Sequence, residues 1–134
     1  MLDKILEYRN KNNEFASYLG IRTTEIREGF ARGEMVIRKE YENAISSVHG
    51  GCIFALADSI GGSAGASYGN RMTTVSADIH YLSAAIGVER LLACAVEIKH
   101  GKRISVYDVE VRDEEEKLIA KGTFSYFDLG VPLF

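Results

Sequence analysis

The sequence predicts an α+β domain in which an antiparallel sheet wraps around one long central helix. An apolar run from Gly50 to Ser67 carries a single charged residue, Asp58, and is long enough to form a helix. Four strand-like runs follow it in succession, separated by short connections. Consecutive strands with short connections favour antiparallel pairing, and one long helix among them is typical of the α+β class.

The part of the chain before this helix predicts helical turns and then a hairpin. Apolar residues recur at helical spacing over residues 2–19, with a break at residues 10–13. Two strand-like segments come next, at residues 21–28 and 31–39, and we expect them to pair as a hairpin. A polar connection, residues 41–48, then leads into the long helix.

Four predicted strands make up the second half of the chain. They are residues 73–82, 90–99, 104–112 and 117–127. In the first of them apolar residues alternate with polar ones, which predicts that one face is buried. The apolar positions are Val75, Ala77, Ile79 and Tyr81, and the polar positions are Thr74, Ser76, Asp78 and His80.

The composition is ordinary for a globular domain. At 134 residues, with 46% hydrophobic and 26% charged residues, the chain fits a single domain that spans residues 1–134. The net charge is −3 and both signs are mixed along the chain, which disfavours a nucleic-acid-binding surface and a membrane protein. The first nine residues contain charges throughout and no apolar signal core, so we expect a cytoplasmic location.

The start of the central helix has the features of a site for negative charge. If the helix begins near Gly50, its first backbone N–H groups have no intrahelical acceptor, and the peptide dipoles favour an anion there. Glycine has no Cβ, so a ligand can approach the backbone closely. Acyl transfer requires such donors where the carbonyl oxygen becomes charged, so Gly50 is a candidate oxyanion donor.

Asp58 is the second candidate, because ionised carboxylates are rarely placed in apolar helices without a partner or a task. It follows Gly50 by eight residues, which corresponds to roughly 12 Å along a helix and roughly 80° around it. Groups that react at one carbonyl must lie within about 3 Å of it. We therefore predict that two antiparallel helices meet across a twofold axis, and that Gly50 of one subunit faces Asp58 of the other.

The spacing of four segments resembles a known family. These segments are Asn43, His49-Gly50-Gly51, Leu56-Ala57-Asp58 and Asp78-Ile79-His80-Tyr81-Leu82. Over nearly its whole length the chain resembles the hotdog-fold acyl-CoA thioesterases of the phenylacetate-pathway type, within the hydroxybenzoyl-CoA thioesterase superfamily. One departure is Ser46, where many members have glycine.

The resemblance implies a hotdog fold and the hydrolysis of acyl-CoA thioesters to a free acid and coenzyme A. The position matched by Asp58 acts in the family as nucleophile or as general base towards water, and the sequence leaves both alternatives open. Asn43 is expected to orient the thioester or the water, and Thr74 to hold the water or the carboxylate. His49 is assigned to binding or to loop geometry. The expected assembly is a homodimer with shared sites, which assembles further into a homotetramer.

A basic cluster is the candidate site for the phosphates of coenzyme A. Lys99, Lys102 and Arg103 flank one turn of an otherwise acidic protein, and the alternative is that this turn is only solvated. Coenzyme A would be part of the substrate, and no resident cofactor or metal is predicted. The two cysteines, Cys52 and Cys94, lie in apolar segments without metal-ligand spacing and are expected to be buried thiols.

Two other functions remain alternatives for the same fold. The first is a non-catalytic acyl-CoA sensor or carrier, against which the intact set of Asn43, Gly50 and Asp58 argues. The second is a hotdog dehydratase, whose histidine motif is not found in the sequence. Asp78 and His80 share a strand face, and we favour a structural or interface role for them over a catalytic pair.

The acyl group itself is not readable from the sequence. One methylene typically changes discrimination by only about 1 to 3 kcal/mol, so specificity depends on details of the pocket. An aromatic or medium-chain acyl group is the expectation from the resemblance. The depth of the pocket depends on which of several residues line it, and the candidates are Phe54, Tyr68, Tyr81, Tyr107 and the residues of the C-terminal tail.

Overall fold

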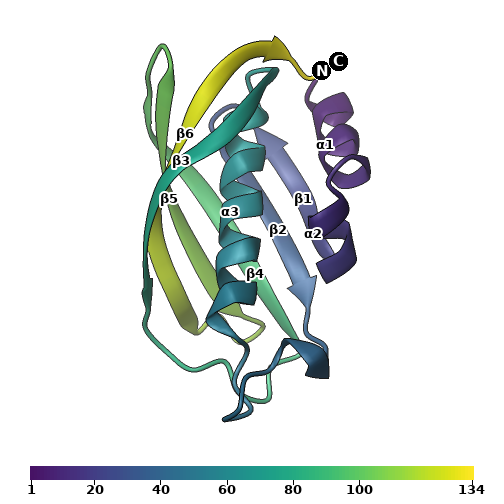
Figure 1. The fold of residues 1–134 in the computed structure, drawn as a ribbon, viewed down its shortest axis with the longest axis vertical. Coiled ribbons are helices and arrows are strands. Elements are labelled where there is room, and N and C mark those ends of the chain that lie inside the picture. The colour runs from purple at the N-terminus through teal and green to yellow at the C-terminus, as the bar shows by residue number, and fades with distance from the viewer.

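The computed structural model describes residues 1–134 as one sheet packed around a long helix, with two short helices outside it (Figure 1). The helices are α1 (Leu2–Lys11), α2 (Glu14–Leu19) and α3 (Gly50–Ala66), and a short 3-10 turn covers Lys39–Tyr41. The strands are β1 (Ile21–Arg27), β2 (Phe30–Val36), β3 (Asn70–Tyr81), β4 (Arg90–His100), β5 (Ile104–Asp113) and β6 (Leu118–Pro132). Each element that the sequence predicts is present in this order.

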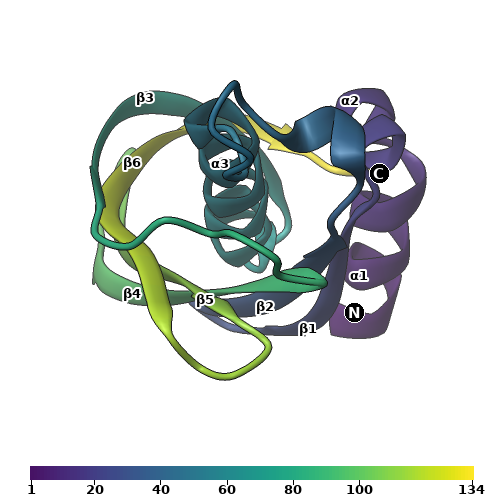
Figure 2. The ribbon, with the colours of Figure 1, turned by 90° about the horizontal axis from the view of Figure 1, so that it is seen from below.

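All six strands form one antiparallel sheet, in the order β1-β2-β4-β5-β6-β3. Figure 2 shows how this sheet curls around α3, so that β3 lies across the helix from β4 and β5. The prediction of an α+β domain with an antiparallel sheet wrapped around one long helix is therefore confirmed.

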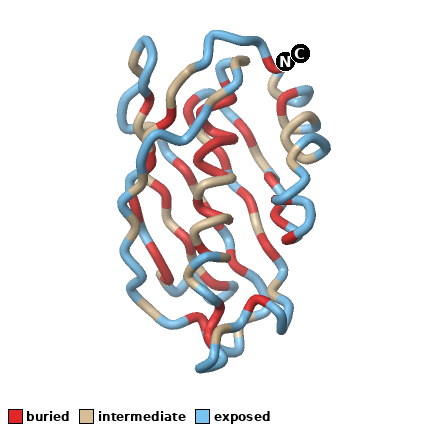
Figure 3. Tube along the Cα trace, viewed as in Figure 1, coloured by how far each residue is buried: buried red, intermediate tan, exposed pale blue.

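Tertiary packing, rather than helix propensity, holds α3 in place. Each glycine in a helix interior costs about 1 kcal/mol relative to alanine, and α3 contains several. Its second half, residues 60–66, is buried on every side (Figure 3). β2 approaches it so closely at Gly33 that a Cβ there would overlap the side chain of Ile60. None of the helices combines the length and the hydrophobicity that crossing a membrane requires.

The two short helices pack outside the sheet, next to β1 (Figure 2). Asn13 caps α2 by accepting a hydrogen bond from the Ala16 N–H at 3.1 Å, and Gly20 ends α2 in the left-handed region with φ 75°. The end of the chain returns to α1, where the ring of Phe134 lies 5.7 Å from the ring of Tyr8. The C-terminal tail therefore covers α1.

A β-bulge in β3 decides which residues of that strand face α3. Thr74 pairs with Tyr126 and Ser76 pairs with Ser125, so Val75 is an extra residue between them. Val75 is 56% exposed and Tyr81 is 50% exposed, so the predicted burial of these two residues is wrong. Because the extra residue shifts the alternation, the side chain of Thr74, which the pattern placed on the polar face, turns towards α3 instead.

Candidate active site

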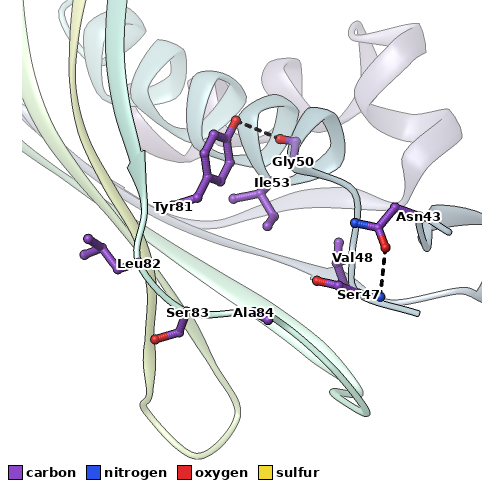
Figure 4. Close-up of a pocket in the computed structure, with 9 residues that line it drawn as sticks. All are labelled: Asn43, Ser47, Val48, Gly50, Ile53, Tyr81, Leu82, Ser83 and Ala84. Atoms are coloured by element: carbon purple, nitrogen blue, oxygen red, sulfur yellow. Dashed lines mark hydrogen bonds between the residues drawn. The ribbon is translucent and has the colours of Figure 1, made fainter. Parts of the chain in front are cut away.

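A pocket of about 240 Å³ lies where the loop before α3 meets the end of β3 (Figure 4). Its walls come from that loop, from the first turn of α3, and from the segment that leaves β3. The lining residues are Asn43, Ser47, Val48, Gly50, Ile53, Tyr81, Leu82, Ser83 and Ala84. Two of the predicted site residues, Asn43 and Gly50, therefore lie on the same pocket.

The first turn of α3 leaves one backbone donor without a partner. His49 caps the helix: its Nδ1 accepts a hydrogen bond from the Gly51 N–H at 2.8 Å. The carbonyl oxygen of His49 accepts from the N–H groups of Cys52 and Ile53. The N–H of Gly50 has no acceptor within the chain. The one free donor at this helix end therefore belongs to Gly50, at the pocket, and His49 shapes the turn that presents it.

Tyr81 covers the outer side of this turn. Its hydroxyl donates to the Gly50 carbonyl oxygen at 3.0 Å, and its ring lies 3.3 Å from where a Cβ on Gly50 would be (Figure 4). Partial burial raises the pKa of Tyr81, which keeps the hydroxyl protonated as a donor. The sequence singled out Tyr81 only as an aromatic lining residue, and its hydrogen bond to the helix start could not be foreseen from spacing.

The side chain of Asn43 organises the loop before α3. Its Oδ1 accepts hydrogen bonds from the N–H groups of Ile45, at 3.0 Å, and Ser47, at 3.1 Å. Its amide nitrogen makes no hydrogen bond within the chain, so it remains available to a ligand in the pocket. Ser46, between these donors, has φ 61°, a left-handed conformation that glycine adopts more readily. This conformation explains why glycine suits the position in the resembling family.

The carboxylate of Asp58 is held through one of its two oxygens. Oδ1 accepts a hydrogen bond from the Thr74 hydroxyl at 2.8 Å and lies 3.1 Å from the Tyr126 hydroxyl. The same Tyr126 hydroxyl lies 2.9 Å from the backbone carbonyl oxygen of Asp58. Oδ2 accepts no hydrogen bond from the chain. The arrangement fixes the orientation of the carboxylate and leaves one oxygen free.

Tyr126 is a site residue that the sequence did not reveal. It lies on β6, and its hydroxyl reaches Asp58 across Gly61 of α3, where a Cβ would overlap it. Burial, and then the charge of Asp58, raise the pKa of Tyr126 well above its ordinary value. The hydroxyl therefore stays protonated and acts as a donor. The one sequence signal for this contact is Gly61 itself. An interior glycine lowers the stability of a helix, so its presence indicates that another group approaches the helix closely there.

The two candidate groups of one chain lie apart. Asp58 follows Gly50 by eight residues on the same helix, and neither Asp58 nor Thr74 lines the pocket that contains Gly50. The chain thus brings together Asn43 and Gly50 at one place and Asp58 and Thr74 at another.

The basic cluster lies far from the pocket of its own chain. Lys99 lies next to the last residue of β4, Lys102 and Arg103 lie in the turn before β5, and all three are exposed. This turn is at the end of the molecule where α3 finishes, whereas the pocket is where α3 begins (Figure 1). His100, beside the cluster, stacks on Tyr68 with ring centroids 3.8 Å apart.

The remaining candidates of the sequence are also apart from the pocket, with one exception. The Oδ1 atom of Asp78 lies 3.7 Å from His80 Nε2, and both side chains are exposed on β3. Tyr107 is fully buried, and its hydroxyl has no hydrogen-bond partner. Phe54 packs against Phe124 with centroids 5.4 Å apart. Of the four aromatic candidates for the lining of the pocket, Tyr81 is the one that lines it.

The comparison with known families identifies the class of protein. A family profile described as the thioesterase superfamily matches residues 46–120, which is more than half of the chain. The chain belongs to the thioesterase superfamily. The matched region begins in the loop before α3 and includes Gly50, Asp58 and Thr74, but it excludes α1, α2, β1, β2 and all of β6 except its first residues.

Individual relatives extend the likeness over almost the whole chain. A protein of Archaeoglobus fulgidus is 38% identical over 125 residues, which are 92% of this chain and 81% of the relative. The Escherichia coli protein named acyl-coenzyme A thioesterase PaaI is 32% identical over 110 residues, or 82% of this chain and 79% of that protein.

Solved structures confirm the predicted fold. The structure of the E. coli PaaI protein from the phenylacetic acid degradation operon superposes with a TM-score of 0.93 at 27% identity, covering 98% of this chain and 95% of the other. A Streptococcus mutans protein bound to acetyl CoA superposes with a TM-score of 0.83 at 26% identity, covering 92% and 99%. The hotdog fold and the resemblance to phenylacetate-pathway thioesterases are confirmed.

Proposed function

We propose that this thioesterase hydrolyses acyl-CoA thioesters to a free acid and coenzyme A. The observation that carries the proposal is the unpaired Gly50 N–H at the start of α3, which opens on a pocket. The E. coli relative named as an acyl-CoA thioesterase and the S. mutans neighbour with bound acetyl CoA support this substrate class. Coenzyme A enters as part of the substrate rather than as a resident cofactor.

The Gly50 N–H is proposed to polarise the thioester carbonyl. Attack on that carbonyl places negative charge on its oxygen, and a fixed donor is most valuable where this charge develops. The dipole of α3 adds a favourable potential at the same end of the helix. The side chain of His49 accepts a hydrogen bond from the Gly51 N–H, so the turn presents only the Gly50 N–H to the pocket. The free amide nitrogen of Asn43, in the loop that lines the same pocket, is proposed to orient the thioester or the attacking water.

The free oxygen of Asp58 is proposed to drive the attack. Thr74 and Tyr126 hold Oδ1, so Oδ2 is the atom directed at the substrate or at a water. In the first route Oδ2 attacks the carbonyl carbon, the C–S bond breaks with release of the coenzyme A thiolate, and water then cleaves the resulting anhydride. In the second route Oδ2 takes a proton from a water that attacks the carbonyl carbon, and the same C–S bond breaks. Single turnover in isotope-labelled water separates these routes, because label enters Asp58 itself only in the first.

A second copy of the chain is proposed to complete each site. β3 is an outer strand of the sheet, so the N–H and C=O groups along its free edge have no partner in the chain. Pairing two β3 strands antiparallel about a twofold axis extends the sheet and sets the two α3 helices antiparallel. Asp58 of one subunit then faces the pocket and the Gly50 N–H of the other. The tetramer and the cytoplasmic location stay predictions from the sequence.

The same arrangement gives the basic cluster a role. Lys99, Lys102 and Arg103 lie where their own α3 ends, and in an antiparallel pair this is the end at which the partner's α3 begins. We therefore propose that they contact the phosphates of coenzyme A bound to the partner's pocket.

Arg103→Ala is expected to raise KM in a salt-sensitive manner with kcat nearly unchanged. Lys11→Ala, an equal change of charge on α1, serves as the control, and a loss of kcat at constant KM in Arg103→Ala would contradict this role.

The proposed function is tested by thiol release from aryl, short-chain and medium-chain acyl-CoAs. Asp58→Asn keeps the size of the side chain and removes its charge, so kcat is expected to fall by at least about 10²-fold. Near-normal turnover in this variant would refute the role of Asp58. Binding of acyl-CoA without release of thiol by the unaltered protein would instead favour the sensor or carrier function.

A further inference from the structure

The ring of Tyr81 lies beside the proposed oxyanion donor and forms one wall of its pocket. Tyr81 is the last residue of β3, where it pairs with Ala120 of β6, and the chain leaves the sheet directly after it. Its ring lies 3.3 Å from where a Cβ on Gly50 would be, so the ring occupies the space that glycine leaves open. The groups bonded to a carbonyl carbon whose oxygen meets the Gly50 N–H therefore lie within reach of this ring (Figure 4).

A hydrogen bond, rather than core packing, holds the ring of Tyr81 in this position. The residue is 50% exposed, so burial alone does not fix its side chain. Its hydroxyl donates to the Gly50 carbonyl oxygen at 3.0 Å, which ties the free end of the side chain to the first residue of α3. The orientation of the ring relative to the Gly50 N–H therefore depends on this hydroxyl.

The other walls of the pocket limit the kind of acyl group that fits. At about 240 Å³ the pocket is smaller than the roughly 300 to 1,000 Å³ of sites that take drug-sized ligands. Val48, Ile53 and Leu82 give it apolar surface, and none of its nine lining residues is charged. A charged acyl group would lose hydration there without gaining a partner of opposite charge. The pocket therefore suits a short or compact, uncharged acyl group.

We propose that the ring of Tyr81 is the specificity-determining wall of this site, which excludes long acyl chains and admits short or compact uncharged ones. The inference rests on the proposed function, because it concerns the acyl group of the same thioester. By donating to Gly50, the Tyr81 hydroxyl keeps the ring across the path that a longer chain would take.

The test is the acyl preference of two variants, measured as kcat/KM over straight-chain acyl-CoAs from acetyl-CoA to decanoyl-CoA. Tyr81→Leu removes the ring, so the ratio of kcat/KM for decanoyl-CoA to that for acetyl-CoA is expected to rise by about tenfold or more. Tyr81→Phe keeps the ring but loses the hydrogen bond, so a smaller rise in the same ratio is expected. Tyr18→Leu, the same substitution at an exposed tyrosine of α2, is the control and should leave the ratio unchanged.

Two results would overturn the inference. The first is a ratio in Tyr81→Leu equal to that of the unaltered protein, which includes an equal loss of kcat/KM for every acyl-CoA. The ring would then face the coenzyme A portion that all these substrates share. The second is an unchanged ratio in Tyr81→Phe, which would refute the part played by the hydrogen bond and which remains measurable if Tyr81→Leu does not fold.

A readout without turnover separates this inference from the proposed function. Dissociation constants of the same acyl-CoAs, measured by calorimetry, report the selection of acyl length directly. Absence of thiol release by the unaltered protein would overturn the proposed function, while these constants would still support or refute the role of Tyr81. Thiol release with a preference for decanoyl-CoA by the unaltered protein would leave hydrolysis standing and overturn the inference.

Discussion

The Tyr126 hydroxyl lies 3.1 Å from Asp58 Oδ1 and reaches it across the backbone of Gly61. Because Thr74 donates to the same oxygen, the carboxylate is oriented by two strands at once, β3 and β6. The charged group of an apolar helix is thus fixed by side chains that are remote from it in sequence.

Tyr126→Phe is expected to lower kcat by about tenfold or more while the protein stays folded. A hydrogen bond to a charged group contributes about 1.5 to 3 kcal/mol, and losing it loosens the carboxylate. Tyr107→Phe is the matched control, because the Tyr107 hydroxyl is equally buried but has no partner. Steady-state kinetics of both variants check this prediction, and equal effects of the two substitutions would count against it.

Gly50→Pro is expected to lower kcat by about 10²-fold or more, because it deletes the proposed oxyanion donor. Proline is well tolerated at the first position of a helix, and His49, with ψ 135°, already has the extended backbone that precedes proline. Gly50→Ala introduces a Cβ that crowds the ring of Tyr81 but retains the N–H, so it should lose much less activity than Gly50→Pro. Similar losses of kcat in both variants would show that the added bulk in the pocket, and not the removal of the N–H donor, lowers the activity.

His49→Ala is expected to destabilise the protein by about 1 kcal/mol through loss of the helix cap. His49→Asn should restore most of this stability, because asparagine offers an acceptor at a similar place. If His49 only shapes the turn, kcat is also expected to be low in His49→Ala and largely restored in His49→Asn. Urea unfolding and kinetics measure both quantities, and full stability with abolished turnover in His49→Asn would instead indicate a direct chemical role.

Stability is expected to fall as the pH rises above about 10. In the folded state burial raises the pKa of Tyr126 and of Tyr107 above the ordinary value of 10.0, whereas in the unfolded chain both ionise near that value. The stabilisation is therefore complete below pH 10 and is lost as the pH climbs towards the folded-state pKa. The urea midpoint, measured at about pH 9 and about pH 11, should drop less in the variant carrying Tyr126→Phe and Tyr107→Phe.

The sequence predicted the elements better than the side-chain contacts between them. The helix start at Gly50 and the single acid at Asp58 follow from local composition, and so does the distance between them along one helix. Thr74 entered through the resemblance alone, and the alternation of its strand assigned it to the wrong face. The bulge at Val75 turns Thr74 to the opposite face, and the alternation of apolar and polar residues does not reveal this bulge.

Tyr126 and Arg9 were not predicted for a different reason. Each comes from an element at one end of the chain and meets α3 only after the sheet has closed around it. A sequence pattern reports which face of its own element a residue occupies, but it does not report which residue of another element lies opposite. Gly61 and Gly62 of α3 each accommodate one particular side chain, Tyr126 and Arg9, and the identity of that side chain is not encoded in the pattern of the helix.

Mixing two inactive variants tests most directly whether each site is shared between two chains. Gly50→Pro and Asp58→Asn are purified separately, combined in equal amounts under conditions that let subunits exchange, and assayed for thiol release. With shared sites, half of the dimers are mixed and each mixed dimer has one intact site of two, so about a quarter of the original activity should return. If no activity returns although mass spectrometry shows mixed dimers, the acid and the amide donor do not act across subunits, and the account is contradicted.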